Sequence, residues 1–210
     1  MKQLIIIGAG GMGKDLYRIA TECDGYKRDY LVKGYLDYPK DDWDSVNYPP
    51  ILGVEDDYII SDNDIFICSL GDVQLKRKVC NKILKRGGKF ISLIHPRAEI
   101  GKNVSVGCGN IIDREVIIGP GVTIGNFNMI QTRTIIGHDS IIGDWNRFDC
   151  NVLCVGGVTV DNAATIHTSS VISHNVTIGD DAVVGAMSFV IRKVHAGTTV
   201  YGNPAKKLDY

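Results

Sequence analysis

The chain has 210 residues, of which 44% are hydrophobic, and its 23 basic and 24 acidic side chains leave a net charge of −1. This composition is typical of a globular protein, and the balanced charge predicts no nucleic-acid partner. No apolar stretch is long enough to span a membrane, and LIIIGAG lacks the basic flank of a signal peptide. We therefore expect a cytoplasmic protein with no membrane partner. The six cysteines form no CxxC pair and are interpreted as reduced thiols.

Residues 1–95 alternate short apolar strands with helices. Strands are predicted over KQLIIIGAG, VKGYLD, DIFICSLGD and KFISLI, and helices over Lys14–Cys23 and residues 73–86. This alternation is typical of a small parallel sheet, so we predict a Rossmann-like α/β domain over residues 1–95. The polar stretch 39–50 is predicted to be a loop.

A glycine-rich turn, GAGGMG at residues 8–13, joins the first strand to the first helix and fits G-x-G-x-x-G. Backbone N–H groups of such a turn can bind a phosphate, and Asp37, at the end of the next strand, could hold a sugar hydroxyl. Two interpretations remain open: a site for a nucleotide or phosphorylated ligand, or a tight strand–helix turn alone. Nicotinamide redox chemistry is disfavoured because no second mononucleotide-binding half follows.

From Ile100 to His195 the chain has an unbroken six-residue period. All sixteen first positions are apolar, eight second positions are Gly, and every fifth position is Val, Ala, Ser, Thr or Asn. Such hexapeptide repeats build a parallel β-helix in which three hexads close one triangular coil. First-position side chains should fill the interior, and second-position glycines should supply positive φ at the corners. We predict a β-helix domain over residues 96–210 that ends in a C-terminal cap.

The period also places the histidines. His138 and Asp139 occupy the third and fourth positions of one hexad, so both should lie exposed on an outer corner. A carboxylate there can fix the imidazole tautomer and raise its basicity, although a solvated surface histidine is the alternative. His174 lies two coils further along the same column, and this spacing suggests, as an alternative, a zinc site of the γ-carbonic anhydrase type. A zinc site needs three protein ligands. Gly179 stands five residues after His174, where a His or Glu ligand would be needed, so we expect no metal.

The order of these motifs is distinctive: the glycine turn, a strand ending at Asp37, LIHPRAEIG, IGHDSIIGD and a terminal YGNPAKKL. In this order the chain resembles, over essentially its whole length, the NeuD/PglD family of sialic acid O-acetyltransferases and bacillosamine N-acetyltransferases. The resemblance implies a Rossmann-like domain joined to a left-handed β-helix, and a homotrimer. It also implies acetyl transfer from acetyl-CoA to a sugar, often an amino sugar carried on a nucleotide.

The resemblance further implies roles for individual residues. His138 corresponds to the catalytic base, Asp139 to the acid that orients it, and Gly156, one coil above His138, to the amide that faces the thioester carbonyl. The implied acetyl-CoA-binding residues are Gly156, His167, Thr168, Ala186 and Lys206, although Lys206 could belong to a solvated basic tail. The implied acceptor-binding residues are Gly8, Gly10, Gly11, Met12, Gly13, Asp37, Gly71, Asp72 and Arg147.

Two positions depart from the family pattern and leave the acceptor open. Met12 stands where nucleotide-sugar members commonly have His, and Arg147 stands where the bacillosamine enzyme has a second His. Arg147 could contact an acidic group of the acceptor or be a solvated surface residue. We expect direct transfer to the amine of a nucleotide-linked amino sugar. The alternatives are a hydroxyl acceptor such as sialic acid, a γ-carbonic-anhydrase-like enzyme and a non-catalytic β-helix protein.

Overall fold

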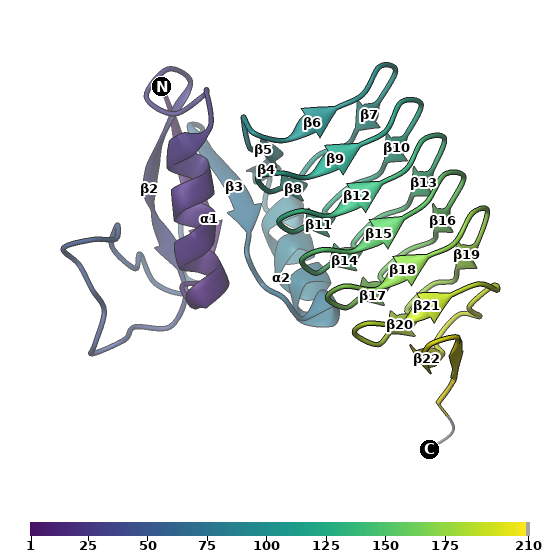
Figure 1. Ribbon diagram of the computed structural model, residues 1–210. Coiled ribbons are helices and arrows are strands. Elements are labelled where there is room, and N and C mark those ends of the chain that lie inside the picture. The colour runs from purple at the N-terminus through teal and green to yellow at the C-terminus, as the bar shows by residue number, and fades with distance from the viewer. Residues whose placement is uncertain (209–210) are drawn as a thin grey trace. The chain divides into compact units, whose positions relative to one another are not determined.

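The computed structural model describes residues 1–208 and separates into two compact units, Met1–Pro96 and Arg97–Tyr210 (Figure 1). Buried apolar side chains form a core in each unit. Within the described part of the chain, no helix has the length and apolar character needed to cross a membrane.

The first unit is built on a parallel sheet with the strand order β2-β1-β3-β4. Its strands are β1 (Lys2–Ile7), β2 (Tyr30–Leu36), β3 (Asp64–Cys68) and β4 (Lys89–Phe90). The central strands β1 and β3 are nearly continuous apolar runs because both of their faces are covered. This is the small parallel sheet that the alternating pattern predicts.

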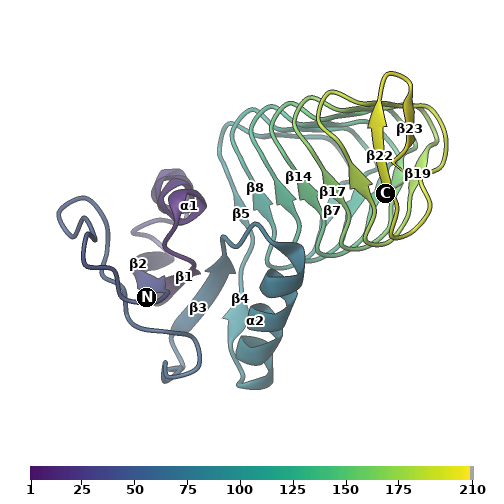
Figure 2. The same ribbon diagram turned by 90° about the horizontal axis from the view of Figure 1, so that it is seen from below.

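Two helices cover this sheet, α1 (Gly11–Glu22) and α2 (Val73–Lys85). The chain moves from β1 to β2 in one direction and from β3 to β4 in the other, so right-handed crossovers place the helices on opposite faces (Figure 2). α1 begins at Gly11 rather than at Lys14, because the glycine turn runs directly into the first helical turn. The predicted KFISLI strand is split, since β4 ends at Phe90 and β5 (Leu93–Ile94) is separate.

The second unit is a β-helix whose coils have three flat sides (Figure 1). Strands pair in parallel with strands 18 residues away, as Ile135 pairs with Leu153, so three hexads make one coil. Face 1 contains β6 (Glu99–Ile100), β9 (Ile117–Ile118), β12 (Ile135–Ile136), β15 (Leu153–Cys154), β18 (Val171–Ile172) and β21 (Phe189–Val190).

The other two faces follow the same rule. Face 2 contains β7 (Ser105–Val106), β10 (Thr123–Ile124), β13 (Ile141–Ile142), β16 (Thr159–Val160) and β19 (Thr177–Ile178). Face 3 contains β8 (Ile111–Ile112), β11 (Met129–Ile130), β14 (Arg147–Phe148), β17 (Thr165–Ile166), β20 (Val183–Val184) and β22 (Thr199–Gly202). β23 (Ala205–Lys207) pairs antiparallel with β22 and forms a hairpin after the last coil.

The hexad predicts the interior of the coils correctly. First-position residues from Ile112 to Val190 are buried in one continuous cluster, together with small fifth-position residues such as Val116 and Ala164. The first-position residues of the first two hexads are the exceptions, since Ile100 is 42% exposed and Val106 is only partly buried. The alternation of one inward and one outward side chain in each two-residue strand explains why the period fills the core.

The predicted use of glycine at the corners is wrong. The residues with positive φ occupy the fourth positions, where φ lies between 53° and 73° from Asn103 to Met187. Second-position glycines instead allow neighbouring coils to approach closely. A Cβ on Gly119 would lie 2.6 Å from the backbone nitrogen of His138, and one on Gly137 would lie 2.6 Å from that of Gly156. The glycine requirement is therefore steric contact between coils rather than backbone conformation.

Candidate active site

The corner that joins face 1 to face 2, here called the His138 corner, carries an oriented imidazole. His138 and Asp139 follow β12 and are both exposed, as the period predicts. His138 Nδ1 lies 2.8 Å from Asp139 Oδ2. Asp139 has a φ of 56°, which turns its carboxylate back toward the imidazole side of the corner. With Nδ1 bonded to the carboxylate, Nε2 is left to exchange a proton with a bound molecule.

Gly156 lies against this imidazole, one coil further along. A Cβ placed on Gly156 would be 2.4 Å from His138 Nε2, so a side chain here would occupy the place of the ring. Gly156 is buried, and no acceptor for its backbone N–H lies among residues 1–208. Buried backbone N–H groups are nearly always paired, so this N–H is one that a ligand can satisfy. An imidazole that could act as a general base and an unpaired amide donor therefore meet at one point.

His174 continues the column beyond Gly156 and is exposed. In the part of the chain that the structure describes, no three His, Cys, Asp or Glu side chains gather closely enough to hold a metal ion. The free cysteines offer no nucleophile beside His138 either. Cys154 is buried, and the Sγ atom of the partly exposed Cys150 donates to Gln131 at 3.3 Å.

The corner that joins face 3 to face 1, here called the Asp149 corner, holds a second polar cluster. The nearly buried Asp149 carboxylate accepts hydrogen bonds from Arg147 Nε at 2.7 Å and from Gln131 Nε2 at 3.3 Å. Its other oxygen lies 2.9 Å from His167 Nδ1. Asp149 thus holds together Arg147 and His167, which the resemblance assigns to the acceptor and to acetyl-CoA respectively.

The remaining predicted acetyl-CoA contacts lie at two places. Thr168 and Ala186 are exposed third-position residues in successive coils of the Asp149 corner, so they continue the column that contains Cys150. Lys206 lies in β23, opposite Tyr201. Within one chain, face 1 separates the His138 corner from the Asp149 corner. The structure therefore places the predicted base and the predicted acetyl-CoA contacts on different edges of the same subunit.

The glycine turn of the first unit is built for close backbone approach. Gly8 has a φ of 96°, and a Cβ on Gly13 would lie 2.1 Å from the carbonyl oxygen of Gly8. A Cβ on Gly10 or Gly11 would meet nothing within 4 Å, so a ligand could approach the backbone of these two residues directly. Met12 follows in the first turn of α1, whose N–H groups have no intrahelical acceptor. These groups form a potential anion site.

Asp37 links this turn to the end of β2. Its carboxylate accepts the N–H groups of Ala9 and Tyr38, each at 2.7 Å, and lies 3.3 Å from Lys40 Nζ. Partial burial would raise the pKa of this carboxyl, but the two amides and the Lys40 ammonium hold the pKa below its usual value. Asp37 is therefore an anion that braces the turn.

The predicted Gly71 and Asp72 follow β3 at the same edge of the sheet. Asp72 caps α2, since its Oδ1 accepts the Leu75 N–H at 2.7 Å. Before them, the buried Ser69 hydroxyl donates to the carbonyl oxygens of Ile7, at 2.8 Å, and Gly8, at 3.0 Å. Asp72 therefore has a clear structural role, and Ser69 ties the β3 end to the glycine turn.

A cavity of about 350 Å³ opens at this carboxyl edge. Its lining combines the end of the glycine turn with the loop after β3 and one side of α2. The lining residues are Ile7, Gly8, Leu36, Asp37, Tyr38, Glu55, Asp56, Leu70, Leu75, Lys78, Val79 and Lys82. In open parallel sheets, ligands bind at this edge of the strands.

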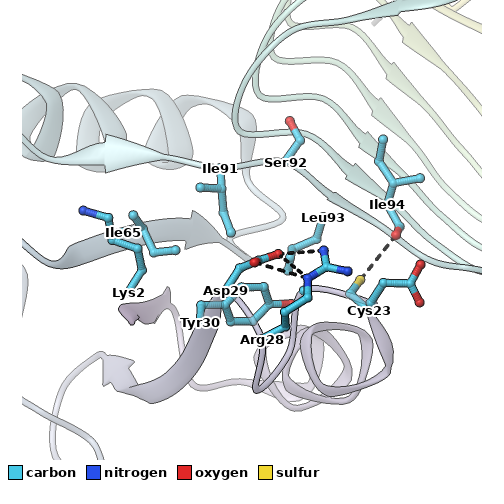
Figure 3. Close-up of a pocket in the computed structure, with 12 residues that line it drawn as sticks. Lys2, Cys23, Arg28, Asp29, Tyr30, Ile65, Ile91, Ser92, Leu93 and Ile94 are labelled. Atoms are coloured by element: carbon cyan, nitrogen blue, oxygen red, sulfur yellow. Dashed lines mark hydrogen bonds and ion pairs between the residues drawn. The ribbon is translucent and has the colours of Figure 1, made fainter.

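A larger cavity, of about 530 Å³, lies at the opposite edge of the sheet, where β1, β2 and β3 begin (Figure 3). Its walls include Tyr30 and Ile65, and two of its charged lining residues, Arg28 and Asp29, bond to each other at 2.8 Å. None of the predicted site residues lines this cavity. The glycine turn and Asp37 therefore relate to the smaller cavity.

Comparisons with known proteins match both units. Residues 3–83 match the family model of the PglD N-terminal domain. PerB from Caulobacter crescentus, in complex with CoA and GDP-perosamine, is 25% identical, with a TM-score of 0.86 over 100% of this chain and 98% of that chain. The chain therefore contains a PglD N-terminal domain and shares the fold of PerB along its whole length. It is an acyltransferase with a Rossmann-like α/β domain and a left-handed parallel β-helix.

Two further structures share the fold. WeeI from Acinetobacter baumannii AYE is 23% identical, with a TM-score of 0.88 over 99% of this chain and 100% of that chain. The acetyltransferase domain of PglB from Neisseria gonorrhoeae FA1090, in complex with acetyl coenzyme A, is 23% identical, with a TM-score of 0.89 over 99% of each chain. No curated protein sequence matches the chain.

Some residues of this acyltransferase were missed by sequence reasoning. Asp149 and Gln131 occupy second positions in hexads of the same column as His167, and the 18-residue spacing between them is the signal that could have joined them. Glu55 and Lys82 of the smaller cavity gave no such signal. They come from an irregular loop and from a helix, and only the tertiary structure brings them together.

Proposed function

We propose that this acyltransferase transfers the acetyl group of acetyl-CoA to the amine of a nucleotide-linked amino sugar, with His138 as general base. The observation that carries the proposal is the meeting of His138 Nε2 with the unpaired amide of Gly156, while Asp139 holds Nδ1. PerB, whose structure contains CoA and GDP-perosamine, and the acetyl-CoA complex of the PglB domain support the choice of donor and acceptor.

The reaction follows from these groups. His138 Nε2 accepts a proton from the acceptor amine as the nitrogen attacks the thioester carbonyl carbon. The new N–C bond leaves negative charge on the carbonyl oxygen, which the Gly156 N–H stabilises. The C–S bond then breaks, the imidazolium returns its proton to the departing sulfur, and the products are the acetylated sugar and CoA. Asp139 keeps the imidazole in the tautomer that begins this cycle.

The first unit would hold the nucleotide of the acceptor. The glycine turn and the first turn of α1 supply N–H groups for a diphosphate, and the adjoining cavity is large enough for a base. Gly71 lies at the same edge and would close over the ligand.

A homotrimer would complete the acetyl-CoA site. The outward side chains of face 1 form an apolar column of Ile117, Ile135, Leu153, Val171 and Phe189. Packing copies through this face buries the column and brings the His138 corner of one copy beside the Asp149 corner of the next. CoA would then lie between them, against His167, Thr168 and Ala186 of one copy, with Lys206 available to a phosphate.

The proposal is tested by His138→Ala. Free-thiol release from acetyl-CoA is measured with UDP-, dTDP- and GDP-linked amino sugars, free sialic acid and simple amino acids. We expect wild-type turnover with a nucleotide-linked amino sugar and a loss of about 10²–10⁴-fold in kcat in the variant. His195→Ala, an exposed histidine near the last coil, is the matched control and should turn over normally.

Sedimentation of the same samples checks that the wild type and both variants have the same oligomeric state, which we expect to be a trimer. Normal turnover by His138→Ala would overturn the assignment of the base. Turnover with sialic acid but with no amine would instead favour O-acetylation.

A further inference from the structure

The lining of the smaller cavity of the first unit includes apolar side chains against which a flat ring could pack. Leu70 contributes from the loop after β3, while Leu75 and Val79 contribute from α2. Leu75 remains 47% exposed, whereas Val79, Cys80 and Ile83 of the same helix are buried. Because Gly8 and Asp37 border the same cavity, a nucleotide whose phosphates sit on the glycine turn can place its base here.

The rim of this cavity carries a carboxylate beside an ammonium group. Lys82 Nζ lies 3.4 Å from Glu55 Oε1 and 2.8 Å from the Asp56 carboxylate. The Glu55 side chain is only 22% exposed, whereas Asp56 is 62% exposed. Both carboxylates line the cavity, Glu55 is the more buried of the two, and Lys82 is the cation next to them.

The segment that carries Glu55 is fixed from both sides. The Gly53 carbonyl accepts the Asp37 N–H at 2.9 Å, which ties the start of the segment to the end of β2. At its other end, the Arg86 guanidinium after α2 donates to the carbonyl oxygens of Glu55 and Tyr58. The backbone that carries the Glu55 carboxylate is thus held in place before any ligand binds, which favours selective recognition.

We propose that this cavity selects guanine, so that the acceptor is a guanosine-diphosphate-linked sugar. Guanine presents adjacent N1–H and N2–H donors, which a carboxylate accepts as a pair, and an O6 acceptor for Lys82. Uracil and thymine present one donor between two carbonyl oxygens, so the Glu55 carboxylate would face an oxygen. Adenine and cytosine lack two adjacent donors. The inference rests on the proposed function only in taking the nucleotide to be part of the acceptor.

Isothermal titration of the full-length protein with GDP, IDP, UDP, dTDP and ADP tests the selection. We expect GDP to bind at least ~10-fold more tightly than UDP, dTDP or ADP, because two charge-assisted hydrogen bonds distinguish it. IDP lacks the N2 amino group and should bind about 10-fold more weakly than GDP.

Glu55→Gln should weaken GDP binding by about 10-fold, because the glutamine N–H₂ group would face a guanine donor where the carboxylate had accepted a hydrogen bond. It should change UDP binding by less than about twofold. Asp57→Asn is the matched control, because Asp57 is an exposed carboxylate on the same segment but does not line the cavity. It should bind GDP as wild type does.

Binding of UDP or dTDP as tight as that of GDP would overturn the proposal, as would equal losses for GDP and UDP in Glu55→Gln, or no nucleotide binding at all. These outcomes are separate from the acetyl-transfer step. GDP selectivity without thiol release from any GDP-amino sugar contradicts the proposed function alone, whereas acetylation confined to UDP-linked sugars overturns only the choice of base.

Discussion

Alanine at position 156 would test the candidate site without removing any functional side chain. The added Cβ would lie 2.4 Å from Nε2 and 2.6 Å from Cε1 of His138, so the imidazole must swing away. Movement of that size breaks the 2.8 Å contact between Nδ1 and Asp139. Gly156 itself lies outside the left-handed region of φ, so alanine fits the backbone without strain.

The expected effects on rate and on stability therefore differ. General-base catalysis contributes about 10²–10⁴-fold, and we expect Gly156→Ala to lower kcat/KM by about 10²-fold or more. The three atoms nearest to the added Cβ all belong to the His138 ring, which is 60% exposed and free to move, so the free energy of unfolding should fall by less than about 1 kcal/mol. Gly137→Ala is the contrasting variant, because its Cβ would meet the backbone of the next coil at 2.6 Å and should destabilise the fold.

Thiol release measures kcat/KM, and urea unfolding measures stability, for Gly156→Ala in the wild-type and His138→Ala backgrounds. With the imidazole already absent, alanine at 156 should cost less than about threefold further in rate, since the two changes act on one group. Full activity in Gly156→Ala, or a second large loss in the His138→Ala background, would refute the steric coupling between these two residues.

Two further predictions concern the fold and the assembly. Burial would raise the pKa of the Asp64 carboxyl, but hydrogen bonds from a backbone amide, a tyrosine hydroxyl and Lys33 hold it below its usual value. Asp64→Asn should therefore lower the free energy of unfolding by about 1–3 kcal/mol at pH 7, and by progressively less in urea titrations as the pH falls below about 4. If the active site lies between copies, inactive His138→Ala and Asp149→Ala chains refolded together in equal amounts should recover about one quarter of wild-type activity, because that share of interfaces has both residues intact. Activity no greater than the mean of the two separate variants would place both residues in one subunit's site.

The six-residue period predicts most of the β-helix because each hexad position has one physical environment. It places His138 on an exposed corner and Gly156 one coil beyond it, and the structure has both there. Its failure at the second position is instructive. A glycine at a corner can mean positive φ or close approach, and the sequence does not distinguish them. Only the folded structure shows that Asp139 adopts the positive φ while Gly137 makes the close approach.

The first unit is less predictable beyond its strands and helices. The glycine turn and Asp37 lie in regular positions of a strand–helix pattern, which is why they can be found by spacing. Glu55 lies in a long loop without a period, and it reaches the cavity because Arg86 and the end of β2 hold the loop there. When tertiary contacts hold an irregular loop in place, the positions of its side chains follow no repeating pattern in the sequence and cannot be predicted from spacing.

The backbone amides at the corners show how one repeat supports both folding and a candidate reaction centre. On the corner between faces 2 and 3, the third-position amides of Asn126 and Asp144 donate to side chains one coil further along, at 2.6 and 2.9 Å. On the His138 corner, Gly156 occupies the equivalent position and His174 stands where the accepting side chain would be, so the amide has no partner among residues 1–208. The third-position N–H group is therefore hydrogen-bonded at the corner between faces 2 and 3. At the His138 corner the equivalent N–H group, next to the imidazole, is unpaired among the described residues. A candidate oxyanion donor arises here because His174, and not a short Asn or Asp side chain, occupies the next coil.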